Sequence, residues 1–293
     1  MMNLTISGYS TALFSTWYFI EELSLLLDAG DGVISNLLQK SRKVKHVFIS
    51  HADRDHLTGL LQLNQLNARP GLPKIYYPKD SASFKAFELF AKDFDRQVEQ
   101  TEWIPLNIGE EIEIKKDAFV TCFKNSHVDA PDSVSKSFSY LVQQSKRKLK
   151  KEYLHLNGKE IRQLRLKQGD EAVTNEVREN IIGYSGDTPV ENFSIWNNTQ
   201  ILVHEATFLH KNEIADREVR RNKHSVLEEV MKCASQISIG NLILGHFSSR
   251  YKNSEIDDCI RHYWGQYQIQ FPVYRILPGQ FVNDILAQKR INC

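Results

Sequence analysis

Four side chains of metal-ligand type lie within six residues of one another, where an apolar run changes into a helical pattern. The apolar residues between 44 and 49 are typical of a buried strand, and the leucines between 57 and 63 recur at helical spacing. The turn between them carries His51, Asp53, Asp55 and His56. Imidazole and carboxylate groups lose hydration on burial unless a metal or a polar network satisfies them. The turn therefore predicts a metal site at the edge of a sheet.

A helix cap is the alternative interpretation of part of this turn. Aspartate is a favoured residue at the start of a helix, so Asp53 or Asp55 could cap the helix that follows while the histidines lie at the surface. A cap explains one aspartate and leaves the other three side chains without a reason to be there. The metal site is therefore the preferred interpretation.

Length and composition indicate one globular domain. The chain has 293 residues, of which 41% are hydrophobic and 25% charged, as in ordinary globular proteins. We expect a single α/β domain over residues 1–293. The formal net charge of +1 excludes an overall basic surface, so any contact with nucleic acid must come from a local patch.

Cysteine usage and hydropathy indicate a cytoplasmic protein. The four cysteines form no C-x-x-C pair, which is typical of reduced thiols rather than of disulfides or a thiolate zinc site. The apolar run between residues 13 and 20 follows no basic segment and is too short to cross a bilayer. We therefore expect no signal peptide and no membrane span.

An inserted basic arm is predicted at about residues 144–170. Nine Lys and Arg residues between positions 146 and 167 are opposed within that stretch only by Glu152 and Glu160. The segment is either an arm that binds an anionic partner or a solvated loop.

Four further stretches place polar residues directly after predicted strands. One strand runs into His127, one ends on Asp187, one precedes His204 and Glu205, and one precedes His246. A helix is expected to begin at Ser225, with Glu228 three residues later completing a capping box. If these strands belong to one packed sandwich, their polar ends meet at one edge.

The order of these residues resembles a known superfamily. His51-x-Asp53-x-Asp55-His56, then His127, Asp187 and His246 resemble the metallo-β-lactamase superfamily. Within it the chain looks most like ribonuclease Z, the tRNA 3′-processing endonuclease. That likeness rests on Tyr184-Ser-Gly-Asp-Thr188, Val203-His-Glu-Ala-Thr-Phe208, His224-Ser225 and His246-Phe-Ser-Ser-Arg-Tyr251.

The resemblance implies a fold, an activity and roles for named residues. The fold would be an αββα sandwich, and the activity would be cleavage of the 3′ trailer of precursor tRNA by a hydroxide activated at two divalent metals. His51 and His127 would ligate one metal, Asp55, His56 and His246 the other, and Asp187 would bridge them. Asp55 would also orient the hydroxide, and His224, supported by Glu205, would protonate the leaving oxygen. The family also suggests a homodimer.

Two of these roles have a structural alternative. Glu205 could form an ordinary ion pair, and His224 could simply flank the cap of the following helix.

The chain departs from the family pattern in two places. Asp53 stands where the family usually has a second histidine; zinc remains the expected metal, but a carboxylate there favours manganese or iron. The family's glycine/proline-rich arm lacks its usual signature, and the basic stretch occupies its place. The predicted RNA contacts are Lys146, Arg147, Lys148, Lys150, Lys151 and Arg250, the last of which could instead form a core ion pair.

Other functions remain open at this point. The same site could hydrolyse a small phosphodiester or another ester, because a fold does not fix its substrate. A degenerate metal site would instead leave an RNA-binding protein without catalysis.

Overall fold

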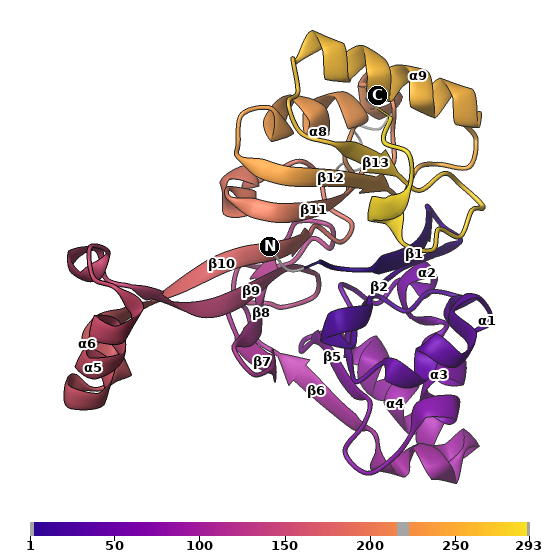
Figure 1. Ribbon diagram of the computed structural model, residues 1–293. Coiled ribbons are helices and arrows are strands. Elements are labelled where there is room, and N and C mark those ends of the chain that lie inside the picture. Colours follow the sequence, from indigo (N-terminus) through magenta and orange to yellow (C-terminus); the bar gives the residue numbers. More distant parts are fainter. Residues whose placement is uncertain (1–2, 216–222, 292–293) are drawn as a thin grey trace.

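The computed structural model describes residues 3–215 and 223–291. Two mixed sheets face each other, and helices cover their outer faces (Figure 1). Among the described residues, no helix combines the length and apolar character needed to cross a membrane. The architecture is the predicted αββα sandwich.

The first sheet contains six strands in sequence order. They are β1 (Ile6–Thr11), β2 (Ser15–Ile20), β3 (Leu25–Leu27), β4 (His46–Phe48), β5 (Lys74–Pro78) and β6 (Glu102–Leu106). The strands from β1 to β3 pair antiparallel and those from β3 to β6 pair parallel. The α-helices in this half are α1 (Val33–Leu37), α2 (Arg54–Leu57), α3 (Leu60–Asn67) and α4 (Ala82–Phe94).

The second sheet has seven strands in the order β13-β12-β11-β10-β9-β8-β7. They are β7 (Glu111–Lys115), β8 (Ala118–Lys124), β9 (Phe138–Leu149), β10 (Thr174–Tyr184), β11 (Thr199–Glu205), β12 (Ile239–Gly245) and β13 (Val273–Arg275). The helices after β10 are α7 (Asn212–Ala215), α8 (Leu227–Ala234) and α9 (Asn253–Gln266). The pairs from β10 to β13 are parallel, so their carboxyl ends meet at one edge.

Three apolar clusters hold the four layers together. The central cluster joins side chains of both sheets, as where the rings of Phe48 on β4 and Tyr140 on β9 meet edge to face at 5.3 Å. A second cluster packs the outer face of the β10–β13 half against α8 and α9. A third packs the first sheet against α1, α3 and α4. Because both sheets are covered on both faces, their central strands are apolar on both sides.

The predicted arm is a two-stranded ribbon with helices at its tip. β9 and β10 continue together beyond the body of the protein, and α5 (Gly158–Gln168) and α6 (Asp170–Val173) lie at the far end (Figure 1). The ribbon pairs Gln143 with Asn180 at its base and Leu149 with Thr174 near its tip. The arm therefore extends past the predicted 144–170, because the outer half of β10 belongs to it.

The returning strand supplies acidic partners that the basic stretch itself lacks. Glu179 on β10 accepts Lys146 at 2.8 Å and Lys148 at 2.7 Å. Arg147 similarly pairs with the carboxylates at the start of α6. Among the described residues no acidic side chain forms an ion pair with Lys150 or Lys151. Exposed pairs of this kind stabilise a protein by at most about 1 kcal/mol, so they leave the cations available to other anions.

The predicted capping box at Ser225 and Glu228 is wrong. α8 begins at Leu227 with Val226 at the capping position, and no side chain caps it. Ser225 is fully buried, and its hydroxyl donates to the carbonyl of Thr188 at 2.7 Å. The hydroxyl therefore joins two loops instead of closing a helix end.

Candidate metal centre

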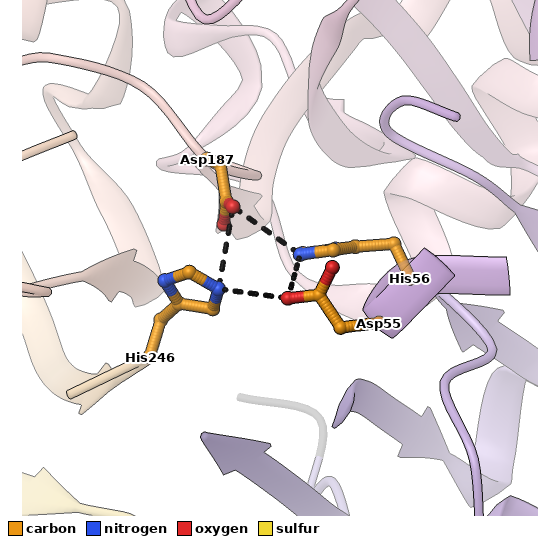
Figure 2. A group of neighbouring side chains, drawn as sticks. All are labelled: Asp55, His56, Asp187 and His246. Carbon is orange, nitrogen blue, oxygen red and sulfur yellow. Dashed lines mark ion pairs between the residues drawn. The ribbon is translucent and has the colours of Figure 1, made fainter. Parts of the chain in front are cut away.

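The predicted ligands come from loops, and from the short helix α2, that follow strands of both sheets. His51 to His56 follow β4, His127 follows β8, Asp187 follows β10 and His246 follows β12. Figure 2 shows that Asp55, His56, Asp187 and His246 point toward one another. The strand ends converge as the sequence predicted, because the two sheets pack face to face.

One group of four ligand atoms comprises the carboxylate of Asp187 and one atom each from Asp55, His56 and His246. Oδ2 of Asp187 lies 3.3 Å from Nε2 of His56 and 3.2 Å from Nε2 of His246. Asp55 Oδ2 lies 3.6 Å from the first of these nitrogens and 3.5 Å from the second. All four ligand atoms lie within 4.8 Å of one another, which is a spacing that one cation can fill.

A second group shares Asp187 with the first. It contains His51, His127 and Asp187, again with ligand atoms within 4.8 Å of one another. Nε2 of His51 lies 3.8 Å from the same Oδ2 of Asp187 that serves the first group. One carboxylate therefore faces both groups.

Asp53 faces the second group from the solvent side. Its Oδ2 lies 3.4 Å from Nε2 of His127 and 3.6 Å from Nε2 of His51, and 63% of its side chain is exposed. Asp53 occupies the position before α2, but its side chain caps no backbone N–H there. The imidazoles of His127 and His51 lower the pKa of Asp53. The carboxylate is therefore directed toward the histidines and does not act as a helix cap.

The rings of the four histidines are fixed through their other nitrogen. Nδ1 of His56 donates to Asp28 at 2.7 Å, and Nδ1 of His127 donates to the carbonyl of Lys223 at 3.0 Å. The hydroxyls of Ser50 and Thr207 contact Nδ1 of His51 at 2.9 Å and Nδ1 of His246 at 2.8 Å. A partner at Nδ1 leaves the Nε2 lone pair free to bind a metal, an arrangement common at metal-binding histidines.

The Nε2 atoms of three histidines are placed as a metal requires. Nε2 of His51, His56 and His246 is buried and has no hydrogen-bond partner among the described residues. A buried polar atom left in this state costs about 1–3 kcal/mol, so three of them around one carboxylate require an explanation. A nitrogen and oxygen ligand set at these spacings suits a divalent transition metal.

The fold is shared with a solved structure of the metallo-β-lactamase fold class. YhfI of Bacillus subtilis, described as a metallo-beta-lactamase fold protein, superposes with a TM-score of 0.63 at 15% identity over 96% of this chain and all of that one. The model of the Beta-lactamase superfamily domain matches residues 24–150. That segment contains His51 to His56 and His127.

Relatives in sequence identify the family within this fold class. The chain is 29% identical to tRNase Z TRZ2 of Arabidopsis thaliana over 88% of its own length and 71% of that protein. It is 32% identical to tRNase Z TRZ1 of the same plant, over 73% of this chain and 76% of the relative. The chain belongs to the ribonuclease Z family. The resemblance drawn from the motifs is confirmed.

The structure of this ribonuclease Z family member also brings Glu205 and His224 to the metal centre. Nδ1 of His224 lies 3.1 Å from Glu205 Oε1 and 3.8 Å from Asp187 Oδ2. Burial opposes protonation of His224, but the carboxylate of Glu205 outweighs it and raises the His224 pKa to about 9. A protonated imidazole beside a metal centre is suited to donating a proton. Glu205 therefore makes an ion pair, and that ion pair lies inside the site.

Thr207 connects this pair to the metal ligands. Its hydroxyl donates to Glu205 Oε2 at 2.6 Å and lies 2.8 Å from Nδ1 of His246. The motif from Val203 to Phe208 contains Thr207, but the sequence pattern assigned it no role. Its position two residues after Glu205 was the available signal.

Asp28 is the most important residue that the sequence argument missed. It is fully buried directly after β3. Besides His56, its carboxylate accepts the backbone N–H of Ser50 at 2.6 Å, the Ser50 hydroxyl at 2.8 Å and the Tyr184 hydroxyl. A buried aspartate with so many donors is a positioning group. The signal that could have found it is an aspartate directly after a fully apolar strand.

The predicted RNA contacts lie apart from these groups. The five on the arm are on the ribbon or just past β9, away from the converging strand ends (Figure 1). Arg250 forms an ion pair with Glu213 and donates to the Tyr251 hydroxyl at 2.9 Å. Nearly half of its side chain is exposed, so this is a surface pair and not a core one.

Proposed function

We propose that this protein is a metal-dependent endoribonuclease that removes the 3′ trailer of precursor tRNA. The observation that carries the proposal is the single oxygen of Asp187 that faces two ligand groups, in a chain similar to tRNase Z TRZ1. Shared carboxylates of this kind are typical of two-metal sites that act on phosphate esters. Family membership then favours RNA over a smaller ester.

The two metals would be held by residues already in place. His51, His127 and Asp187, with Asp53 on the open side, would hold one ion. Asp55, His56, His246 and Asp187 would hold the other. Bound there, the ions would supply Lewis acidity for in-line displacement at phosphorus. Zinc is the proposed metal, and the carboxylate of Asp53 makes the group with His51 and His127 suited to manganese or iron as well.

The protein's own groups would handle the protons. We assign Asp55 to orienting the attacking water, because its carboxylate faces the centre between His56 and His246. His224 would donate its proton to the leaving oxygen, and Glu205 would keep His224 charged. The buried Glu205 also receives the backbone N–H of Thr188 at 2.8 Å, which fixes the carboxylate in place.

The arm would bind the tRNA body away from the cut. Lys150 and Lys151, which form no ion pair within the described part of the chain, lie just past the outer end of β9. A long RNA would contact them while its 3′ end occupies the metal centre. Phosphate contacts of this kind make binding fall steeply with salt. Lys146, Arg147, Lys148 and Arg250 would add weaker contacts, since each is already paired with a carboxylate.

We also propose a homodimer in the cytoplasm. The described cysteines, Cys122, Cys233 and Cys259, are free thiols, as expected in a reducing compartment. A relative named as chloroplastic makes cell fractionation the appropriate test of location. Light scattering of the purified protein tests the dimer.

One experiment separates this function from its competitors. The purified protein is incubated with a 3′-extended precursor tRNA, with zinc and with manganese, and the products are sized on a gel. We expect one cut near the 3′ end of the mature tRNA, and no cut by Asp187→Ala. Hydrolysis of a small phosphodiester without cleavage of the RNA would indicate a small-ester hydrolase. RNA binding without bound metal or cleavage would indicate a non-catalytic relative.

A further inference from the structure

Two large apolar side chains are exposed at the tip of the β1–β2 hairpin. β1 ends at Thr11 and β2 begins at Ser15, so a turn of three residues joins them. In this turn Leu13 is 86% exposed and Phe14 is 61% exposed. The first two residues of the apolar run between residues 13 and 20 lie in this turn, and the rest forms β2. Exposed apolar side chains are common singly, and this pair acquires meaning from its position.

The hairpin tip is attached to the metal centre. The backbone N–H of Leu13 donates to Asp55 Oδ2 at 3.1 Å, the same oxygen that faces His56 and His246. The N–H of Ala12 donates to the carbonyl of Phe247 at 3.2 Å, directly after His246. The tip is therefore a fixed part of the rim of the metal centre.

The start of β2, directly after the tip, is also held in place. The Ser15 hydroxyl donates to the carbonyl of Asp31 at 2.7 Å, and Gly30 donates to the carbonyl of Thr16 at 3.0 Å. A Cβ on Gly30 would lie 2.4 Å from the Ser15 hydroxyl oxygen and 2.3 Å from the carbonyl oxygen of Asp55. The close approach leaves the tip little freedom to move.

Leu13 is an unexpected residue for its backbone conformation. Its φ is +70°, in the left-handed region that glycine adopts freely and that disfavours residues with a Cβ. Packing does not offset this cost, because the side chain is almost entirely in solvent. A residue that is locally unfavourable and unpacked at the rim of a reaction centre indicates a function for its side chain.

We propose that Leu13 and Phe14 form a platform on which one unpaired nucleobase of the RNA stacks beside the scissile phosphate. This inference rests on the proposed function. A phosphate that reaches Asp55 brings the nucleotides on both of its sides past the rim, and Leu13 is the residue hydrogen-bonded to that carboxylate. An aromatic ring accepts any base by its face, so the platform would position single-stranded RNA without reading its sequence.

Steady-state cleavage of 3′-extended precursor tRNA by the metal-loaded protein tests the platform. We expect Phe14→Ala to raise KM by about 5- to 150-fold, the range for losing one aromatic base stack, with a much smaller change in kcat. Leu13→Gly should weaken RNA binding and keep or raise the melting temperature, because glycine relieves the left-handed backbone. Phe94→Ala, at a 70% exposed ring on α4, is the matched control and should behave as wild type.

A substrate series identifies the base. Each unpaired nucleotide near the cut is replaced in turn by an abasic sugar, and KM is compared for wild type and Phe14→Ala. At one position the KM values of the two proteins should become equal, because the base that stacks on Phe14 is absent.

Failure of the proposed function can be distinguished from failure of the platform alone. A wild-type protein that does not cleave the RNA would remove the proposed function and the platform with it. Wild-type cleavage with unchanged KM in both variants, or no position at which the proteins converge, would remove the platform alone. A Phe14→Ala protein that changes from dimer to monomer by light scattering would show that the tip is a protein interface.

Discussion

Asp28 accepts the Nδ1 proton of His56 at 2.7 Å, with both side chains fully buried between the two sheets. Burial opposes a charge on His56, but the carboxylates of Asp187 and Asp28 hold its pKa well above the ordinary value. Asp28 also fixes the ring so that Nε2 faces Asp187 at 3.3 Å. Asp28 contacts no proposed metal, yet it determines which nitrogen of His56 faces the metal centre.

Replacing Asp28 should weaken metal binding without removing any ligand. In Asp28→Asn the amide nitrogen must face one of the donors that the carboxylate accepts, and loss of the negative charge weakens the hydrogen bond that orients His56. Loss of such a partner typically costs about 10–100-fold in metal affinity. Chelator competition measures the affinity, and Asp31→Asn, at an exposed position in the same turn, is the control. Equal affinity in both variants would contradict the positioning role.

Removing Asp187 should affect both metals together. We expect the purified protein to carry about two metals per chain, and Asp187→Ala to lose most of both, since one oxygen faces both ligand groups. Elemental analysis of the desalted proteins measures the content. Asp132→Ala, at a fully exposed aspartate, should keep the wild-type content. Retention of both metals by Asp187→Ala would rule out a bridging role.

Variants at Asp53 distinguish a ligand from a helix cap. As a ligand, Asp53→Ala should preferentially lose the metal near His51 and His127, and Asp53→His should bind zinc more tightly by restoring an imidazole. As a cap, Asp53→Ala should instead cost about 1 kcal/mol of stability in the metal-free protein. The carboxylate caps no N–H, so we expect the metal-free stability to change by less than about 0.5 kcal/mol. Zinc titration and metal-free denaturation decide between the two.

His224 should matter for rate and not for metal content. His224→Ala removes the proposed proton donor, and a general acid contributes roughly 10²–10⁴-fold to a rate. Glu205→Gln should also slow cleavage, because it removes the charge that keeps His224 protonated. Single-turnover cleavage gives the rate, and His262→Ala, at an exposed histidine on α9, is the control. A full-rate His224→Ala enzyme would exclude it from the mechanism.

His46 should make the fold less stable in mild acid. Burial, followed by the charges of Lys74 and Lys45, lowers the His46 pKa from 6.5 to about 4. The unfolded chain therefore binds the proton more readily, and stability present above pH 6.5 is lost as the pH falls toward 4, by up to about 1.4 kcal/mol per pH unit.

The variant His46→Phe keeps a ring against Tyr76, with which His46 now stacks at 6.1 Å, and cannot titrate. Urea unfolding between pH 4 and 7 should show a shallower loss of stability in the variant than in wild type. Parallel curves would mean that His46 titrates alike in both states.

Local pattern was sufficient to select the candidate ligands, and the layers needed the family resemblance. His51 to His56 follow an apolar strand, and Asp187 and His246 follow two others, so their chemistry and position could be read from neighbouring residues. The αββα arrangement followed from the family resemblance, and the three apolar clusters agree with it.

Local pattern failed where a side chain has two possible partners. Ser225 has the spacing of a capping box, yet its hydroxyl is used by the carbonyl of Thr188, which is 37 residues away. Asp53 has the position of a cap, yet its carboxylate turns to the histidines. In both cases a tertiary partner replaces a local one. Burial strengthens the hydrogen bond of Ser225, and the imidazoles of His127 and His51 attract the carboxylate of Asp53.

The sequence by itself determined which residues can bind metal, because the identity and order of those side chains are local properties. Tertiary structure alone decided how they are oriented. Asp28 and Tyr184 are 156 residues apart, and His127 and Lys223 are 96 apart, so no local pattern joins them. Packing of one sheet against the other brings the first pair into contact, and loops at one edge of the second sheet bring the second pair together. This packing also excludes the water that would otherwise satisfy them, and so fixes the outer nitrogens of the histidines and leaves the inner ones facing the metal centre.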